Sequence, residues 1–178
     1  MELAAKGDSD AFAALARLSA DRLFTIAHRI LRDHHLAEDA LQQTLITIWD
    51  ELPRLRDPAK FDAWTYRVIV RASVSAARRE RRTAVVSLLP SDADPVARDD
   101  VGTIVDRDEL ERGFRRLSPD HRAVLVLRHF AGLSLAEVAE VIGIPVGTAG
   151  SRLHYAAREL RVFLEADRPA GQTNERTA

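Results

Sequence analysis

The residues best suited to bind another molecule lie in one stretch, residues 133–161, which has the pattern of two short helices joined by a tight turn. The second predicted helix places hydroxyl, imidazole and guanidinium groups on faces away from its apolar residues. Such groups contact the bases and phosphates of DNA. An ordinary helical hairpin that binds no DNA would have the same spacing, so this alternative stays open. The predicted DNA-contacting residues are Thr148, Ser151, Arg152, His154, Tyr155 and Arg158.

Local signals predict where these two helices begin and end. Ser134 followed three residues later by Glu137 is typical of a capping box. Gly143 suits the left-handed residue that ends a helix, and Pro145 suits the first turn of the next one. The packing faces are predicted from the apolar spacing as Val138, Ala139 and Ile142, then Ala149, Leu153, Ala156 and Leu160.

A second group of cationic and aromatic residues lies earlier in the chain. A loop carries Arg54 and Arg56, and Asp57 followed by Pro58 favours a helix start, with the helix predicted to run to about Arg82. Phe61, Trp64 and Val68 are predicted to be core residues of this helix. Bases stack on aromatic and guanidinium groups with about 1–3 kcal/mol per base, although arginines also suit a helix C-terminus. The remaining candidates for nucleic-acid contact are Lys60, Tyr66, Arg67, Arg71, Arg78 and Arg79.

Two further helices are predicted before this one. The first runs from Asp8 toward Arg32, with its apolar residues at helical spacing, namely Phe12, Leu15, Leu18, Leu23, Ile26, Ala27 and Ile30. The second runs from about Leu36 to Leu52 and is predicted to bury Leu41, Leu45, Ile48 and Leu52. Its other face is acidic and amide-rich, which is typical of a solvated surface and also compatible with a partner-binding surface. That face comprises Glu38, Asp39, Gln42, Gln43, Asp50 and Glu51.

The composition excludes several kinds of site. The chain of 178 residues has no cysteine, so disulfides and thiolate zinc sites are excluded, and its six histidines show no metal-ligand spacing. We find no glycine-rich phosphate loop and no catalytic set of nucleophile and base, so no enzymatic activity, metal or cofactor is expected. No run of about 18 apolar residues occurs, which predicts a cytoplasmic protein without membrane insertion.

The order of charges predicts two bodies and a connector. Five arginines fall between Arg71 and Arg82, eight acids between Asp92 and Glu111, and eight arginines between Arg112 and Leu164. Helices are expected at about 104–117 and from Ser118 to Gly132, the latter with Val124, Leu127 and Phe130 inward. We therefore predict an all-α fold with domains at 1–86 and 107–166, a flexible acidic linker at 87–106 and a disordered tail at 167–178.

Four segments resemble one protein family. They are AEDALQQTLITIW (37–49), FDAWTYRVI (61–69), LSPDHRAVLVLRHFAGLSLAEVAEVIGIPVGT (117–148) and SRLH (151–154). They are similar to regions two and four of bacterial RNA polymerase sigma factors in the extracytoplasmic-function (ECF) group. The resemblance covers about Asp8 to Leu164 and implies two helical domains that direct promoter-specific transcription initiation.

The resemblance implies partners and roles for the candidate residues. The first domain would bind the β′ clamp helices of core RNA polymerase through Glu38, Asp39, Gln42, Gln43 and Asp50. It would also recognise and open the −10 element of promoter DNA through Arg54, Arg56, Lys60, Phe61, Trp64, Tyr66, Arg67, Arg71, Arg78 and Arg79. The second domain would meet the β flap and read the −35 element through its helix-turn-helix, and an anti-sigma factor would hold the protein inactive.

Several positions depart from the family pattern. Arg71 and Ser75 stand where the family has Asn and Asp, so Arg71 is expected to contact phosphate instead of a base. Ala149 and Gly150 replace Val-Lys, and Tyr155 and Ala157 replace arginines, so we expect weak salt dependence of −35 binding. Two other functions fit the same sequence: a stand-alone helix-turn-helix regulator with a helical sensor domain, and a non-DNA interaction protein.

Overall fold

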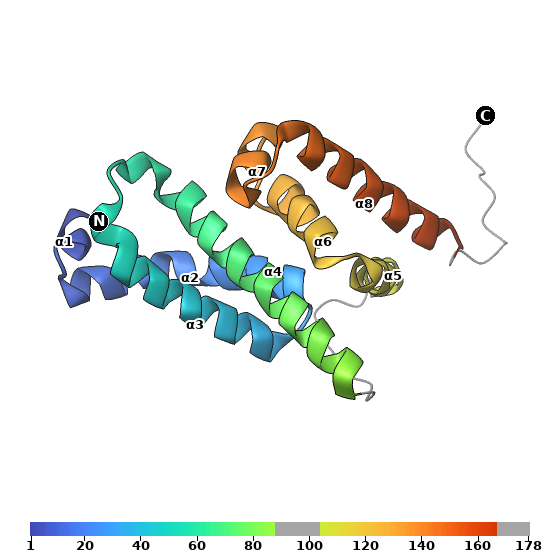
Figure 1. The fold of residues 1–178 in the computed structure, drawn as a ribbon, viewed down its shortest axis with the longest axis horizontal. Coiled ribbons are helices and arrows are strands. Elements are labelled where there is room, and N and C mark those ends of the chain that lie inside the picture. The colour runs from blue at the N-terminus through green and yellow to red at the C-terminus, as the bar shows by residue number, and fades with distance from the viewer. Residues whose placement is uncertain (88–103, 167–178) are drawn as a thin grey trace.

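The computed structural model describes residues 1–87 and 104–166, in which every regular element is a helix or a helical turn (Figure 1). The predicted all-α class is confirmed. The predicted flexible linker and disordered tail fall largely or wholly on residues outside this description. The elements are α1 (Glu2–Ala5), α2 (Ser9–Leu31), α3 (His34–Glu51), η1 (Leu52–Arg54), η2 (Pro58–Lys60), α4 (Phe61–Ser87), α5 (Ile104–Arg116), α6 (Pro119–Leu125), η3 (Val126–Phe130), α7 (Leu135–Ile142) and α8 (Val146–Ala166).

Side-chain caps set the starts of the first two long helices. The Asp8 carboxylate accepts a hydrogen bond of 2.8 Å from the backbone N–H of Ala11, which satisfies a free donor at the start of α2. Asp33 does the same for the N–H of Leu36 at 2.8 Å. Because this cap precedes His34, α3 begins two residues before the predicted start at Leu36.

Helices α2, α3 and α4 pack into a bundle around Ile26, Ile30, Ile48 and Ile69. Most of the apolar residues predicted for α2 are in or against the core, and Leu18, which is 84% exposed, points away from the partner helices. The prediction for α3 was partly wrong. On α3 the fully buried stripe is Ala37, Ala40, Thr44 and Ile48, while the predicted Leu41 and Leu45 flank it half-buried.

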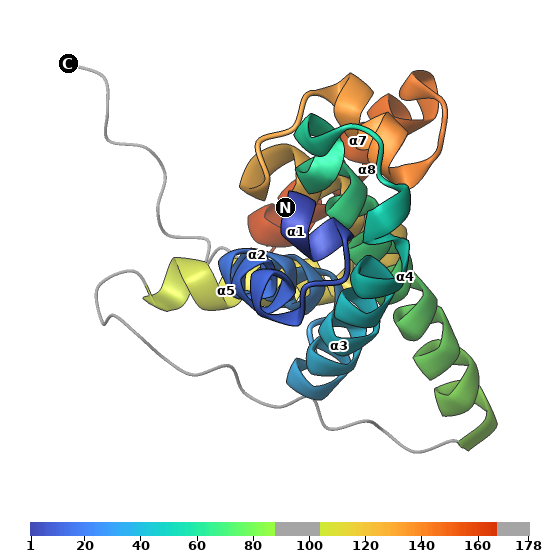
Figure 2. The same cartoon turned by 90° about the vertical axis from the view of Figure 1, so that its left-hand side faces the viewer.

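Helix α4 is shared by both halves of the molecule. It packs against α2 and α3 on one side and against α6 and α7 on the other. Figures 1 and 2 show this long helix running beneath the second group of helices. The helix continues to Ser87, five residues beyond its predicted end at Arg82. The two predicted bodies are therefore in direct contact, along a surface that we call the junction, where α4 faces α6, α7 and α8.

The second half consists of α5 to α8. Ser134 and Glu137 form the predicted capping box at the start of α7, and Gly143 ends this helix with a left-handed φ of 78°. Pro145 immediately precedes α8 instead of lying in its first turn. Gly113 lets α5 approach α8 closely, because a Cβ at this position would lie 2.6 Å from Leu160 Cδ1.

The end of the α6 segment differs from its prediction. Val124 and Leu127 are buried as expected, but Phe130 is exposed. The chain forms a π-helical turn over η3, which changes the direction of its last side chain. The guanidinium of Arg29 lies 4.5 Å from the centroid of the Phe130 ring and covers it from α2.

Candidate nucleic-acid and partner interfaces

The acidic and amide-rich side chains of α3 form one exposed face. Glu38, Asp39, Gln42, Gln43 and Asp50 are all exposed, as predicted. His34 and His35 lie 3.3 and 3.6 Å from the Glu38 carboxylate, at the N-terminal end of this face. Its polar groups are therefore accessible to a partner. We call these five residues, with the two described next, the α3 face.

Two apolar residues on the same face were not predicted. Ile46 is 49% exposed and Trp49 is 39% exposed. The Trp49 ring packs edge-on against Phe12, with centroids 4.8 Å apart, which holds the indole in place. Their spacing from Gln42, four and seven residues, was the available signal, because it puts them on one side of the helix. The α3 face thus combines exposed apolar side chains with polar ones, as protein interfaces do.

The loop between α3 and α4 presents three cations to solvent. Arg54, Arg56 and Lys60 are exposed. The Asp57 carboxylate accepts a hydrogen bond of 3.0 Å from the Ala59 N–H and fixes the turn before α4. Phe61 is buried and Trp64 half-buried, with ring centroids 6.2 Å apart. Of the aromatic candidates in this region, only Trp64 offers partly exposed surface.

Tyr66 was predicted to face a nucleic acid, and this placement was wrong. It is 5% exposed, because its position on α4 turns it toward α2. Its hydroxyl accepts a hydrogen bond of 2.9 Å from Arg22 Nη1. This contact raises the pKa of Arg22 above its ordinary value. Tyr66 therefore ties α4 to α2.

Three arginines of α4 point toward the second half of the molecule. Arg67 lies 3.5 Å from the Glu140 carboxylate of α7. Arg78 donates to both carboxylate oxygens of Asp120 on α6, at 3.2 and 3.0 Å. The Nη2 atom of Arg71 lies 3.8 Å from where a Cβ on Gly143 would be. The predicted DNA face of α4 is thus partly directed at protein.

Asp120 also binds an arginine from α8. Arg152 Nη1 donates to its Oδ1 atom at 3.1 Å. Arg152 was predicted to lie on the outer face of its helix, but this contact holds it in the junction. A carboxylate suits the first turn of α6, where the helix dipole favours negative charge. One acidic side chain therefore joins the two helices predicted to contact DNA.

The remaining DNA candidates of α8 are open to solvent. Ser151, His154, Tyr155 and Arg158 are exposed, and Tyr155 is 57% exposed. The ring centroids of His154 and Tyr155 lie 5.8 Å apart. Thr148 is half-buried, and its carbonyl accepts a hydrogen bond of 3.0 Å from the Ser151 hydroxyl. We call the four exposed residues the α8 face.

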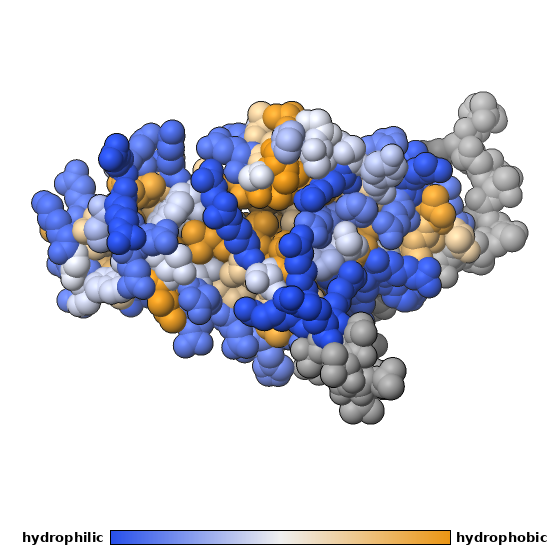
Figure 3. Space-filling view, viewed as in Figure 1, coloured by the Kyte–Doolittle hydropathy of each residue, from blue (hydrophilic) through white to orange (hydrophobic). Residues whose placement is uncertain are grey.

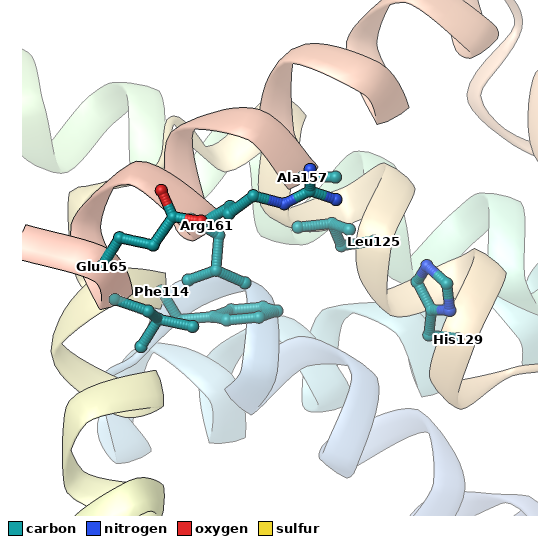
Figure 4. Close-up of a pocket in the computed structure, with 8 residues that line it drawn as sticks. Phe114, Leu125, His129, Ala157, Arg161 and Glu165 are labelled. Atoms are coloured by element: carbon teal, nitrogen blue, oxygen red, sulfur yellow. The ribbon is translucent and has the colours of Figure 1, made fainter. Parts of the chain in front are cut away.

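A separate pocket lies between α5, α6 and α8. It has a volume of about 550 Å³, and apolar side chains such as Phe114, Leu125 and Leu160 form most of its wall. Figure 4 shows Phe114 and Leu125 facing this space, with Arg161, Glu165 and His129 around it. None of the predicted DNA or polymerase contacts lines this pocket.

Within residues 1–87 and 104–166 no three His, Cys, Asp or Glu side chains are arranged to hold a metal ion. None of the described helices is long and apolar enough to cross a membrane.

Comparisons with known proteins match both halves. Residues 15–83 match the family model for sigma-70 region 2, and residues 113–162 match that for sigma-70 region 4. The ECF RNA polymerase sigma factor SigL of Mycobacterium tuberculosis is 34% identical over 166 residues, which cover 89% of this chain and 94% of SigL. SigW of Bacillus subtilis, also an ECF sigma factor, is 27% identical over 175 residues, with 88% and 90% covered.

Solved structures share the fold. The sigma factor RpoE of Bartonella quintana, crystallised with the anti-sigma factor NepR, is similar with a TM-score of 0.72 at 24% identity, over 88% of this chain and 98% of RpoE. CnrH, solved with the cytosolic domain of CnrY, gives a TM-score of 0.65 at 24% identity, over 94% and 96% of the two chains. With both sigma regions in order and a relative matched over nearly its whole length, the chain belongs to the ECF RNA polymerase sigma factors, which are non-enzymatic proteins of transcription initiation.

Proposed function

We propose that residues 1–86 bind core RNA polymerase and the −10 element, that residues 107–166 bind the −35 element, and that residues 87–106 connect them. Sigma factors bind RNA polymerase and promoter DNA, and this chain would do so in the cytoplasm. The single observation that carries the proposal is the pair of exposed faces on α3 and α8, whose chemistry differs as the two partners require.

The α3 face is the proposed site for the β′ clamp helices. Asp39, Gln42 and Gln43 supply hydrogen-bond acceptors and amide donors, and Trp49 supplies a rigid apolar anchor of the kind that dominates binding energy at interfaces. Glu38 and Asp50 would interact with cations at the rim. The contacts of Trp49 with Phe12 keep the indole ordered before binding, which lowers the entropy cost of association.

Binding of fluorescently labelled protein to core polymerase tests this assignment. We expect Trp49→Ala and Asp39→Lys each to weaken binding about tenfold or more. Asp21→Lys is the matched control, because Asp21 is exposed on α2, outside the α3 face. Full affinity of both α3 variants would refute the assignment, and failure of the wild-type protein to bind core polymerase would refute the proposed function.

The −10 element would be held by the loop cations Arg54, Arg56 and Lys60 and by Trp64, with Arg67, Arg71, Arg78 and Arg79 joining when the two halves separate. Phe61 and Tyr66 would support this surface from within the bundle. Opening DNA costs about 1.4 kcal/mol per stacked step, so polymerase contacts must add to those of the loop. Promoter opening measured with and without core polymerase tests this requirement.

The −35 element would be read by Ser151, His154, Tyr155 and Arg158, with Thr148 and Arg152 at the edges of the surface. The α8 face is exposed while the two halves are in contact, which favours some duplex binding by the free protein. A gel shift with a −35 duplex, with and without core polymerase, measures how much of the duplex binding the free protein achieves alone. Promoter-specific binding that needs no polymerase would favour the alternative function of a stand-alone regulator.

The apolar pocket of Figure 4 is the proposed contact for the β flap, because it has room for apolar side chains and none of its lining residues belongs to the α8 face. RpoE and CnrH were solved with anti-sigma partners, and by analogy we propose that a cognate anti-sigma factor holds this protein inactive. Co-purification from the native host tests that partner. Phe114→Lys should weaken a flap-peptide complex and leave −35 duplex binding unchanged.

A further inference from the structure

A basic cavity of about 720 Å³ lies in the junction. Arginines from α4 and α8 line it, together with one acid, and we call it the arginine cavity. Figure 3 shows apolar surface between hydrophilic side chains on the face where α4 meets the second half. The charged lining residues are Arg71, Arg78, Arg81, Arg82, Arg152 and Asp120.

The charges of this cavity are not balanced. Five guanidinium groups face one carboxylate, which leaves a formal charge of 5 − 1 = +4. Asp120 is already bonded to Arg78 and Arg152. Arg71, Arg81 and Arg82 have no ion pair with any residue that the structure describes. Three guanidinium groups therefore remain to bind an anion.

A buried arginine beside the cavity adds an independent sign of a missing anion. Arg122 on α6 is 6% exposed, and its Nε atom has no hydrogen-bond partner. Burial, followed by the positive charge of Arg81, lowers the pKa of Arg122 to about 10. A buried charge without a counterion is costly. An anion on Arg81 would relieve this repulsion.

Part of the wall of the cavity is apolar. Val70 and Val74 come from α4, and Ile142 and Ile144 come from the end of α7 and the turn after it. Small-molecule sites have volumes of about 300–1,000 Å³ and combine apolar walls with a few charged groups. This cavity has both features. A DNA duplex is too wide to enter it while the halves are in contact.

We propose that the arginine cavity binds a small molecule of nucleotide size that carries a polyphosphate group. Its phosphates would lie on Arg71, Arg81 and Arg82, since the planar guanidinium binds phosphate oxygens in pairs. Its organic part would lie on the wall formed by the valines and isoleucines.

Such a ligand would link small-molecule binding to promoter recognition. The cavity takes residues from both halves, so the ligand binds only while they are in contact and stabilises that arrangement by mass action. Arg71 and Arg78 would then be withheld from the −10 element. The ligand would lower promoter binding without covering the α8 face.

Calorimetry of the full chain, without polymerase or promoter, tests the site directly. Adenosine 5′-triphosphate is the probe. Inorganic tripolyphosphate and adenosine, measured separately, show how much the phosphates and the nucleoside of this probe each contribute to its affinity. We expect the double variant R81A/R82A to lose about tenfold or more in affinity for the triphosphate. The matched control is R54A/R56A, which removes two exposed arginines outside the cavity.

Equal losses in the two double variants, or no heat of binding at physiological salt, would overturn the proposal. Weaker binding of tripolyphosphate than of the nucleotide supports a role for the apolar wall, and equal binding refutes that role. Because the assay contains neither polymerase nor promoter, its failure leaves the proposed sigma function intact.

The effect on the arrangement of the halves has a second readout. The chain has no cysteine, so dyes attached to Asp21→Cys and Glu165→Cys report the distance between α2 and α8. The triphosphate should increase energy transfer in the wild-type background and leave it unchanged with R81A/R82A. No change in the wild-type background would refute the link between the ligand and the junction.

Discussion

The two surfaces proposed to face promoter DNA are in different states. On α8, the exposed residues include Tyr155 and Arg158, which point to solvent. On α4, Arg67 and Arg78 are bonded to Glu140 and Asp120 of the other half. The same arrangement therefore leaves the −35 surface open and directs part of the −10 surface at protein.

This difference suggests an order of events. Carboxylates in the junction occupy two guanidinium groups of α4. If α4 holds the −10 element as proposed, the halves would have to separate before these groups could bind its phosphates. The ion pair between Arg78 and Asp120 is weak, because the Arg78 side chain is 60% exposed and exposed ion pairs contribute about 0–1 kcal/mol. Phosphates and polymerase contacts can replace it. The α8 face needs no such step.

The largest expected effect comes from reversing the charge of Asp120. Asp120→Arg removes two ion pairs and places a third cation beside Arg78 and Arg152. We expect the free protein to bind single-stranded −10 DNA about tenfold more tightly, since like charges repel across the junction. Fluorescence anisotropy with a labelled oligonucleotide measures this. A thermal melt checks folding, since a cation is unfavourable in the first turn of α6.

Asp21→Arg controls for the added charge, because Asp21 is exposed on α2 and makes no ion pair in the described structure. If both variants gained equally, net charge and not the junction would explain the result. Asp120→Asn, which removes charge without reversal, should show a smaller increase than Asp120→Arg.

A second prediction concerns the salt dependence of −35 binding. Arg158 is the one cation on the α8 face, because Arg152 is held by Asp120. Each phosphate contact contributes roughly −0.9 to the slope of log K against log salt concentration. We expect a slope of roughly −1 for the wild-type chain and roughly −2 for Asp120→Asn, which frees Arg152. A steep slope for the wild-type chain would contradict the prediction that −35 binding depends weakly on salt.

Substituting alanine for two glycines of the second half should change the melting temperature in opposite directions. A methyl on Gly150 would meet Leu135 at an ordinary 3.5 Å, and alanine suits a helix interior better by about 1 kcal/mol. We expect Gly150→Ala to raise the melting temperature by about 2–4 °C. Gly113→Ala should lower it, because the added Cβ would clash with Leu160 and Phe163. Equal shifts from both changes would refute the close packing of α5 on α8.

The smallest expected effect is a dependence of stability on pH at the end of α2. Burial, followed by the charge of Arg32, lowers the pKa of His28 below 6.5. The unfolded chain therefore binds a proton at a pH where the folded chain does not, so stability is full above about pH 6.5 and falls as the pH decreases. The difference in melting temperature between pH 7.5 and pH 5.5 should be smaller for His28→Gln than for the wild-type chain. His35→Gln, at an exposed position, should keep the wild-type difference.

Local chemistry explains what the sequence could predict. Asp8, Ser118 and Ser134 are caps whose partners lie within three residues, so each is readable from neighbouring positions. The junction is different. Asp120 binds partners 42 and 32 residues away, on two helices whose relative placement no local pattern specifies. Exposure of Arg152 was overestimated for that reason.

The same limit applies inside the bundle. Tyr66 looked free because aromatic residues beside arginines are typical of nucleic-acid surfaces, yet Arg22, which is 44 residues earlier, binds its hydroxyl. Exposed Ile46 and Trp49 were missed for the opposite reason, since an apolar residue at helical spacing is usually core. Which face of α3 lacks a neighbour depends on the whole bundle.

Because α4 packs against both halves of the molecule, its packing also affects the solubility of a fragment that contains only the first half. Val70 and Val74 line the junction on the outer side of α4, where the second half helps to shield them. A fragment that ends near residue 87 would expose this apolar strip to water, next to several arginines. Exposed apolar surface promotes self-association. We therefore expect the isolated first half to be less soluble than the whole chain, although its own bundle is complete.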